Sequence, residues 1–391
     1  MGTVELHGLE RLPLNTSQSI AVIGAGVHGL AAAWHLSQRP NVAVTVFEQH
    51  SIGHPRGSSH GAVRITRSTY PKPGYVRLAQ RARAETWPAL EAALGTTLIE
   101  SMPGCIFGPA GGVFDAYAAG VEAGGGDVIR LSPTDARSRF PGLTLDGCEV
   151  LWDRSAGVVR ADSTLSGLAR LARDGGVDIR TGTPVHSVSL TRGRVELSTQ
   201  LGAAAFDRVI VAAGPWTHRL FPNLPRAMSV VRQSVGFFAH ADGTDGAPAG
   251  QCIWIHLGVD PADHFYGLPV DGILKAAQHV EAARGDNPDE WATPSPDALS
   301  VLDRFVKKRI APPVDRVRLD TCCYTNTPNA DFVVSKHPET DQIIIGAGFS
   351  GHSFKFGPLI GQILAELAAD GDCLLPEYQR LRPRFDLMRA T

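Results

Sequence analysis

The chain has 391 residues and a formal charge of −2, and 43% of its residues are hydrophobic. This length is enough for two domains, and the near-neutral charge gives no reason to expect nucleic acid or a membrane surface as a partner. The six cysteines are scattered with no C-x-x-C pair, which predicts no metal site and favours a reducing cytoplasm. The longest apolar stretch is too short for a membrane span. Residues 1–17 are expected to form a loose N-terminal extension.

The first structured segment, "SIAVIGAGVHGLAAAWHL", predicts a strand, a glycine turn and a helix. In the motif Gly24-x-Gly26-x-x-Gly29 the glycines permit a tight turn, the approach of a pyrophosphate and close packing of helix on strand. A second predicted strand ends at Glu48, about twenty residues on, where an acid accepts hydrogen bonds from a ribose. The segment therefore indicates dinucleotide binding, and Glu48 argues against a 2′-phosphate.

The next segment, "GSSHGAVRITR", combines small residues with two arginines, Arg64 and Arg67. A pair of arginines is usually surface charge, but small residues in this position are able to wrap a dinucleotide.

Two later segments, 207–217 and 341–368, each read as a buried strand followed by a glycine turn. A nicotinamide dehydrogenase does not ordinarily need its last sixty residues in the cofactor domain. A protein that binds FAD does need them there, because segments from both ends of the chain cover the long FAD molecule. The pattern therefore favours FAD over NAD.

The stretch "DTCCYTNTPNADF" places Cys322 beside Cys323. Consecutive α-carbons lie about 3.8 Å apart, below the usual range of roughly 4.4 to 6.8 Å in a disulfide, so a bond between the two cysteines would be strained. If the stretch is a strand, Cys322 shares a face with Tyr324 while Cys323 points the other way. The two cysteines are then expected to have different roles.

Taken together, "GAGVHG", "GSSHGAVRITR", "AAGPWT", "CCYT" and "GFSGHSFKF" resemble the monomeric sarcosine oxidase and N-methyltryptophan oxidase family, within the D-amino-acid-oxidase-like flavoproteins. The resemblance implies an α/β fold in which a Rossmann-like FAD-binding domain is interleaved with an α+β substrate domain that carries an antiparallel sheet. The implied FAD-binding domain comprises residues 18–90, 151–222 and 322–388. The implied substrate domain comprises residues 91–150 and 223–321.

The resemblance also implies how FAD is held. The sulfur of Cys322 would be joined to the 8α-methyl of the flavin, although a cysteine is more often a small buried hydrophobe, the role favoured for Cys323. The other implied cofactor residues are Gly24, Gly26, Val27, His28, Gly29, Glu48, Ser58, Ser59, His60, Arg64, Val185, Ala213, Gly214, Trp216, Gly348, Phe349, Ser350, Gly351 and Lys355.

The implied catalytic residues are also carried over from the resemblance. Arg67 and Lys355 would bind a substrate carboxylate, for which a planar guanidinium offers a two-pronged bond. In "FYGLPVDGILKAAQH", Lys275 would stand over the flavin and stabilise superoxide, unless it is an ordinary surface lysine. Tyr324, His279 and Tyr266 would line the substrate pocket. The segment after Tyr266 is shorter than in the family, which predicts that Tyr266 is displaced.

The function implied is an FAD-dependent oxidase, a monomer, that acts on an amino or imino acid with a secondary amine. Hydride transfer to flavin is followed by reduction of molecular oxygen to hydrogen peroxide. Ala62 and Ser353 depart from the family pattern, which suggests a substrate bulkier than sarcosine. One alternative is a dehydrogenase that passes electrons to a quinone or carrier protein, and oxygen consumption distinguishes it. Another is an FAD-binding subunit without turnover, which flavin bleaching by a substrate excludes.

Overall fold

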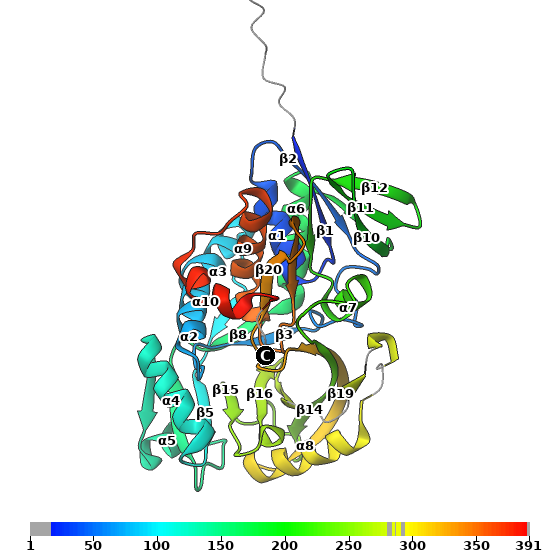
Figure 1. Cartoon of the computed structure of the whole chain (residues 1–391). Coiled ribbons are helices and arrows are strands. Elements are labelled where there is room, and N and C mark those ends of the chain that lie inside the picture. The colour runs from blue at the N-terminus through cyan, green and yellow to red at the C-terminus, as the bar shows by residue number, and fades with distance from the viewer. Residues whose placement is uncertain (1–16, 280–283, 286, 291–293, 389–391) are drawn as a thin grey trace, which may run out of the picture.

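A computed structural model describes residues 17–279, 284–285, 287–290 and 294–388. The N-terminal extension predicted at 1–17 therefore lies, apart from Ser17, outside the described residues. In Figure 1 one half of the molecule carries β1, β2 and the helices around them, and the other half carries β14 to β19 with α8 beneath them.

The first half is built on a six-stranded sheet in the order β20-β21-β13-β1-β2-β9. Its neighbouring strands are parallel, apart from β20, which runs antiparallel to β21. Four consecutive residues of β1, Ile20–Ile23, are buried, and because successive side chains point to opposite faces, both faces of the sheet are covered. The strands are β1 (Gln18–Ile23), β2 (Val42–Phe47), β9 (Asp178–Arg180), β13 (Arg208–Val211), β20 (Val333–His337) and β21 (Thr340–Ala347).

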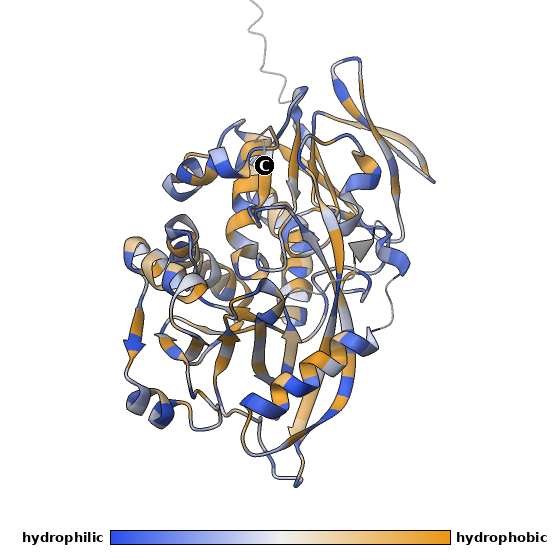
Figure 2. Ribbon diagram, turned by 60° about the horizontal axis from the view of Figure 1, so that its bottom comes forward, coloured by the Kyte–Doolittle hydropathy of each residue, from blue (hydrophilic) through white to orange (hydrophobic). Residues whose placement is uncertain are grey.

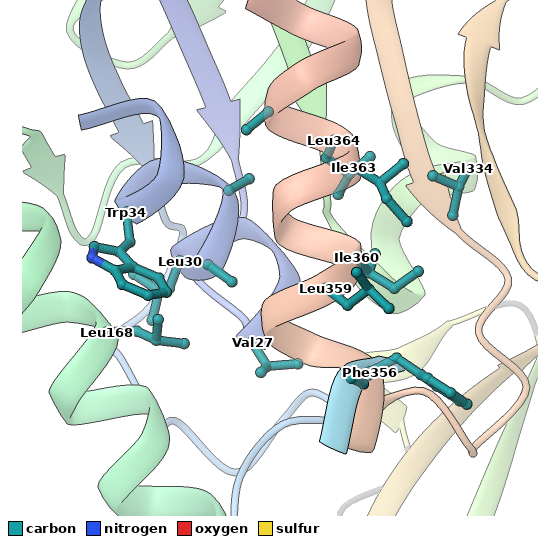
Figure 3. Packing of buried hydrophobic residues seen from close by; sticks show 14 of the residues in the cluster. Val27, Leu30, Trp34, Leu168, Val334, Phe356, Leu359, Ile360, Ile363 and Leu364 are labelled. Atoms are coloured by element: carbon teal, nitrogen blue, oxygen red, sulfur yellow. The ribbon is translucent and has the colours of Figure 1, made fainter. Parts of the chain in front are cut away.

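Helices cover one face of this sheet. Ile20 and Val22 of β1 pack with α1 (Val27–Ser37), α6 (Ala161–Asp174) and α9 (Gly357–Ala369) in a single hydrophobic cluster. Figure 3 shows α1 and α9 side by side, with Leu30 and Trp34 of α1 directed toward Leu168 of α6. The two helices approach closely because Gly361 has no side chain: a β-carbon there would lie 2.3 Å from that of Ala31.

A small sheet covers the other face. Ala21 and Ile23 alternate with Ile20 and Val22 along β1. They therefore point to this second face, where they pack with Val195 and Leu197. The small sheet is antiparallel and contains β10 (Val185–Thr191), β11 (Arg194–Thr199) and β12 (Gly202–Phe206).

The second half is built on a nine-stranded sheet in the order β18-β14-β17-β16-β15-β5-β7-β6, with β19 also paired to β14. Its neighbours are antiparallel except β5 and β15. The strands are β5 (Gly104–Gly108), β6 (Val128–Leu131), β7 (Glu149–Asp153), β14 (Ser229–His240), β15 (Ile253–His256), β16 (Phe265–Val270), β17 (Ile273–Gln278), β18 (Arg284–Gly285) and β19 (Val314–Asn326).

The two faces of this sheet have different neighbours. Phe238 and Leu274 pack with α8 (Pro296–Arg309). Phe237 and Leu268 lie on the opposite face and pack with Val63 from the segment that joins the two halves. Figure 2 shows that hydrophobic residues follow the inner strands and helices, while hydrophilic residues gather on the outer turns.

The remaining elements connect or cover these layers, and a fourth sheet contains β3, β4 and β8. The predicted α/β class with an antiparallel sheet in the second half is confirmed, while the domain boundaries stay a prediction. These elements are β3 (Val63–Thr66), α2 (Pro73–Arg81), α3 (Trp87–Leu94), β4 (Ile99–Ser101), α4 (Gly112–Gly124), α5 (Pro133–Arg139), β8 (Gly157–Arg160), α7 (Thr217–Leu220) and α10 (Pro376–Phe385).

Candidate active site

A cavity of about 490 Å³ lies between the two halves. On one side it is lined by residues that end or directly follow the parallel strands β1, β2, β13 and β21, among them Ile23, Phe47, Ala212 and Gly348. The carboxyl ends of parallel strands are the usual ligand-binding edge of an α/β sheet. On the other side it is lined by one face of the nine-stranded sheet.

The glycine turn after β1 leaves no room for side chains. Gly24 has a φ of +103°, and a β-carbon on Gly29 would lie 1.9 Å from the carbonyl oxygen of Gly24. A β-carbon on Gly26 would lie 3.1 Å from Oγ of Ser59, which accepts a hydrogen bond from the amide of Val27. The turn therefore presents bare backbone at the N-terminus of α1, a geometry that suits a phosphate group.

Glu48 stabilises this turn through hydrogen bonds to backbone amides. Its Oε2 accepts a hydrogen bond from the amide of Ala25 and its Oε1 one from the amide of His50, both at 2.8 Å. Each carboxylate oxygen has a second lone pair, and the side chain lines the cavity. Glu48 is thus placed to bind a hydroxyl group while it holds the turn.

The segment that carries Arg64 is held by its own hydrogen bonds. The guanidinium donates to the carbonyl oxygens of Ser58, His60 and Val63. The ring nitrogens of His60 lie 3.1 and 2.9 Å from the carbonyl oxygens of Gly57 and Thr321. Arg64 lines the cavity, but its donors mainly fix the shape of this segment.

The C-terminal turn closes over the cavity. Gly351 has a φ of +72°, and a β-carbon there would lie 2.2 Å from Cε2 of Tyr324, so only glycine fits. Phe349 stacks on the ring of His28 at 3.9 Å between centroids. Burial lowers the pKa of His28 to about 3, so its imidazole is neutral at physiological pH.

Tyr70 contacts both residues that are predicted to bind the substrate carboxylate, Arg67 and Lys355. Nζ of Lys355 donates to the hydroxyl of Tyr70 at 3.0 Å and to the carbonyl of His352 at 2.7 Å. The guanidinium of Arg67 lies over the Tyr70 ring, 4.2 Å from its centroid. Burial, and then the charge of Arg67, hold the pKa of Lys355 well below its usual value. Two cations far apart in the sequence therefore meet at one place.

Asp153 fixes the backbone between Arg67 and Tyr70. Its buried carboxylate accepts hydrogen bonds from the amides of Ser68 and Thr69 at 2.8 and 3.0 Å, and from the Thr69 hydroxyl at 2.6 Å. Because Asp153 lies at the end of β7, this strand sets the position of the cation pair.

The opposite wall is formed by side chains on one face of the nine-stranded sheet. The hydroxyls of Tyr266 and Tyr324 are 3.3 Å apart. The ring of His279 lies 5.8 Å from that of Tyr324, and burial, with a smaller effect of Arg67, lowers the pKa of His279 to about 3. Tyr266 is therefore not displaced from this group, despite the short segment that follows it.

Lys275 lies farther along the same face. Its ammonium is buried, with Nζ 3.4 Å from the carbonyl oxygen of Val63. Burial, and then the charge of Arg64, lower its pKa to about 7, although Cys322 and Asp320 act in the opposite direction. A buried group that changes charge near neutral pH is typical of an active site.

The two adjacent cysteines point to opposite faces of β19. Cys322 pairs with Gln233 of β14 and Cys323 with Arg232, so consecutive side chains alternate as expected. Among the described residues no cysteine is in a disulfide. Burial raises the pKa of Cys323 to about 12, which keeps it a thiol at neutral pH.

These positions can now be compared with known proteins. A family model described as FAD dependent oxidoreductase matches residues 19–367. The chain belongs to this family. It is 33% identical to the peroxisomal sarcosine oxidase of Mus musculus, and the match covers 94% of this chain and 93% of the relative.

Two further comparisons agree. The chain is 29% identical to the monomeric sarcosine oxidase of Arthrobacter sp. (strain TE1826), with 92% of this chain and 94% of the relative covered. The solved structure of NikD, described as an unusual amino acid oxidase essential for nikkomycin biosynthesis, has a TM-score of 0.79 and 25% identity and covers 93% of this chain and 97% of its own. The protein is an FAD-dependent oxidoreductase, as the resemblance implied.

The cavity suits FAD in two respects. A β-carbon on Gly24 or Gly29 would clash with backbone in the turn, and Glu48 lies beside the turn with further lone pairs on its carboxylate oxygens. All the predicted cofactor and catalytic residues line the cavity except Gly29, which packs beneath the turn. Their individual roles stay predictions.

Within the described part of the chain no group of three or more His, Cys, Asp or Glu side chains is arranged to hold a metal ion.

Several residues of the site were not found from the sequence. Tyr70 follows Arg67 at a spacing of three, which was the only available signal. Asp153 had no signal, because its partners are brought to it by the fold. Residues that line the cavity itself and were also missed include His54, Tyr117, His264, Asp320 and His352.

Proposed function

We propose that the protein is an FAD-dependent oxidase of an amino or imino acid with a secondary amine. The observation that carries the proposal is the meeting of Arg67 and Lys355 around Tyr70, in a cavity that also contains the Tyr266–Tyr324 pair and Lys275. Two cations in a partly apolar cavity suit a carboxylate.

The FAD would be held by this chain's backbone at one end of the cavity. The Gly24–Gly29 turn would bind the diphosphate, Glu48 a ribose, and the 348–351 turn the opposite side of the cofactor. When bound, FAD supplies the hydride acceptor and passes two electrons on to the next acceptor.

Both cations keep donors for a substrate carboxylate. Nη1 of Arg67 is buried and has no hydrogen-bond partner in the described part of the chain. Nζ of Lys355 uses two hydrogen bonds, to Tyr70 and His352, and an ammonium has three donors. Arg67 and Lys355 would therefore bind the carboxylate and fix the orientation of the Cα–N bond.

His279 and the two tyrosines would surround the amine. Because His279 is neutral, it adds no charge that repels an amine, and its ring and the tyrosine hydroxyls offer hydrogen bonds. The substrate carbon loses a hydride and the nitrogen loses a proton to solvent, which gives an imine that water hydrolyses. These residues hold and orient the substrate, and no dedicated base is required.

Lys275 would serve the second half of the reaction. Oxygen takes up two electrons and two protons to become hydrogen peroxide, and its first reduced form is an anion. A buried ammonium that is already in position stabilises this anion without reorganisation.

We also propose that Cys322 carries the FAD covalently. It shares a strand face with Tyr324, and both Cys322 and Lys275 line the cavity. Bond formation would remove the thiol proton of Cys322 and one hydrogen of the 8α-methyl group, and oxygen would take up the two electrons released.

The covalent bond is tested by mass spectrometry of acid-denatured protein. Wild type should retain the mass of FAD, Cys322→Ser should release it, and the matched control Cys323→Ser should retain it. Complete loss of flavin from fully loaded wild type would contradict the bond while leaving the oxidase proposal intact.

The function is tested by anaerobic mixing of the protein with N-methyl, cyclic and D-amino acids. We expect one N-alkyl or cyclic acid to bleach the flavin band, and oxygen to restore it with release of one hydrogen peroxide. Bleaching that oxygen does not reverse would indicate a dehydrogenase. No bleaching by any acid in the panel would contradict the proposed substrate class.

The oligomeric state and location belong to the same proposal. We expect a monomer, in line with the name of the Arthrobacter relative. The cytoplasmic location expected from the cysteines stays a prediction, since the mouse relative is named as peroxisomal. No helix in the described residues is long and apolar enough to cross a membrane.

A further inference from the structure

A second cavity, of about 320 Å³, lies on the other side of Lys275. Val63, Lys275 and Asp320 line both this cavity and the larger one. The ammonium of Lys275, with the Val63 carbonyl that it contacts, therefore forms part of the wall between the two spaces.

The strand register explains the position of this second cavity. Phe237 of β14 pairs with Lys275 of β17 on one side and with Arg318 of β19 on the other, so the three side chains form a row on one sheet face. The guanidinium of Arg318 lies 3.8 Å from the centroid of the Phe237 ring, and Nζ of Lys275 lies 6.0 Å from it. An aromatic ring therefore separates the buried cation from the exposed one.

The same sheet face continues into the larger cavity. Along β19, Arg318, Asp320, Cys322 and Tyr324 point to one side, because side chains alternate along a strand. Arg318 lines the second cavity, Cys322 and Tyr324 line the first, and Asp320 lines both. One surface thus runs from the substrate pocket past Lys275 to the second cavity.

The second cavity has apolar side chains at Val63, Phe237 and Val270, and charged side chains at Asp162, Lys275, Arg318 and Asp320 also line it. Phe237 and Val270 are buried, whereas Ala62, Asp162 and Leu319 at the rim are exposed. A small uncharged molecule such as oxygen loses no hydrogen bonds when it enters such a space and reaches the apolar side chains.

We propose that this second cavity is the route by which molecular oxygen reaches Lys275 and hydrogen peroxide leaves. Oxygen then approaches from the solvent side of the lysine, and bound substrate or imine in the larger cavity does not block it. The inference rests on the proposed oxidase function and adds no chemical step to it, since the route carries oxygen in and peroxide out.

The route is tested by a substitution at its rim. Ala62→Trp places a bulky side chain over the opening at an exposed position, and Ala62→Ser is the matched control. The enzyme is reduced by light, without substrate, and mixed with oxygen in a stopped-flow instrument. We expect the second-order rate of reoxidation to fall several-fold in Ala62→Trp and to stay at the wild-type value in Ala62→Ser. Ala62 does not line the larger cavity, so anaerobic reduction by substrate should be unchanged in both variants.

Xenon provides a reading that does not depend on activity, because it occupies apolar cavities. In crystals under xenon pressure we expect an atom between Phe237 and Val270 in wild type and none in Ala62→Trp. If tryptophan at position 62 leaves xenon in place, Leu319→Trp blocks the same rim from β19. Wild-type reoxidation speed in a variant that excludes xenon would overturn the route.

The outcomes separate the two proposals. If reduced wild type itself reacts slowly with oxygen, the oxidase function fails. If wild type reacts rapidly and so does the blocked variant, the oxidase function stands and the route is wrong.

Discussion

The two walls of the active site are built in different ways. The wall at the ends of the parallel strands includes glycine turns, where a β-carbon on Gly24, Gly348 or Gly351 would clash with neighbouring atoms. The wall on the nine-stranded sheet is mainly side chains that alternate along β14, β16, β17 and β19. The glycine turns therefore depend on chain geometry, whereas the contacts on the nine-stranded sheet depend on residue identity.

This difference predicts how the two walls respond to substitution. A change in a backbone-built wall displaces the main chain and should abolish FAD binding as a whole. A change in a wall of side chains should leave FAD in place and alter one step of the reaction. The predictions below test this separation.

The largest effect is expected at the glycine turn. In Gly29→Ala the added β-carbon would lie 1.9 Å from the Gly24 carbonyl, so the turn must move. Overpacking of this kind costs roughly 1–3 kcal/mol, and we expect purified protein without FAD and with a lower Tm. Gly346→Ala in β21 is the control, because its β-carbon would meet only the flexible end of Leu364. A flavin-to-protein ratio in Gly29→Ala equal to that of wild type would contradict the claim that FAD binding depends on the geometry of this turn.

The next effect concerns the carboxylate. A charge-assisted hydrogen bond contributes about 1.5–3 kcal/mol, so Arg67→Gln should lower kcat/KM about tenfold or more while FAD stays bound. Arg67→Lys should lose less, because lysine keeps the charge but not the fork. The decisive comparison uses an acid substrate and its methyl ester: wild type should prefer the acid, and Arg67→Gln should lose most of that preference. Undiminished preference for the acid would show that Arg67 does not bind the carboxylate.

A smaller effect is expected from Tyr70→Phe. The ring beneath Arg67 remains, but Lys355 loses the hydroxyl that accepts its hydrogen bond at 3.0 Å. A typical hydrogen bond contributes about 0.5–1.5 kcal/mol, so KM for the acid should rise several-fold while FAD content stays at the wild-type value. Loss of FAD in this variant would mean that Tyr70 belongs to the cofactor wall.

The smallest effect is a pH dependence of reoxidation. The pKa of Lys275 is lowered to about 7 by burial and then by Arg64, while Cys322 and Asp320 oppose the shift. The ammonium is therefore present below pH 7 and is lost as pH rises through that value. We expect the reoxidation rate of photoreduced wild type to fall a few-fold over this interval, and Lys275→Met to show no such step. An unchanged wild-type rate would contradict a role for the charged lysine.

The sequence predicted the cofactor wall better than the wall of side chains, for a physical reason. A glycine turn such as Gly24-x-Gly26-x-x-Gly29 is local, and its spacing alone implies the geometry. The alternation of Cys322 and Cys323 is also local, and the structure bears it out.

Features that depend on strand pairing could not be predicted from the sequence. The sequence does not show that Phe237 lies between Lys275 and Arg318, because β14, β17 and β19 are far apart along the chain. Tyr70 between Arg67 and Lys355, and Asp153 beneath Ser68, are also long-range contacts. The resemblance to a family supplied Lys275 and Lys355, but not the residues that hold them.

The proposed mechanism makes a division between Arg67 and Lys355, which bind the substrate carboxylate, and Lys275, which acts on oxygen. This is measured by timing the two half-reactions of Lys275→Met separately in a stopped-flow instrument. Anaerobic reduction by substrate should stay near the wild-type rate, because Arg67 and Lys355 are intact, and reoxidation by oxygen should slow far more. Equal losses in both half-reactions would make Lys275 a substrate-binding or structural residue and would contradict the division.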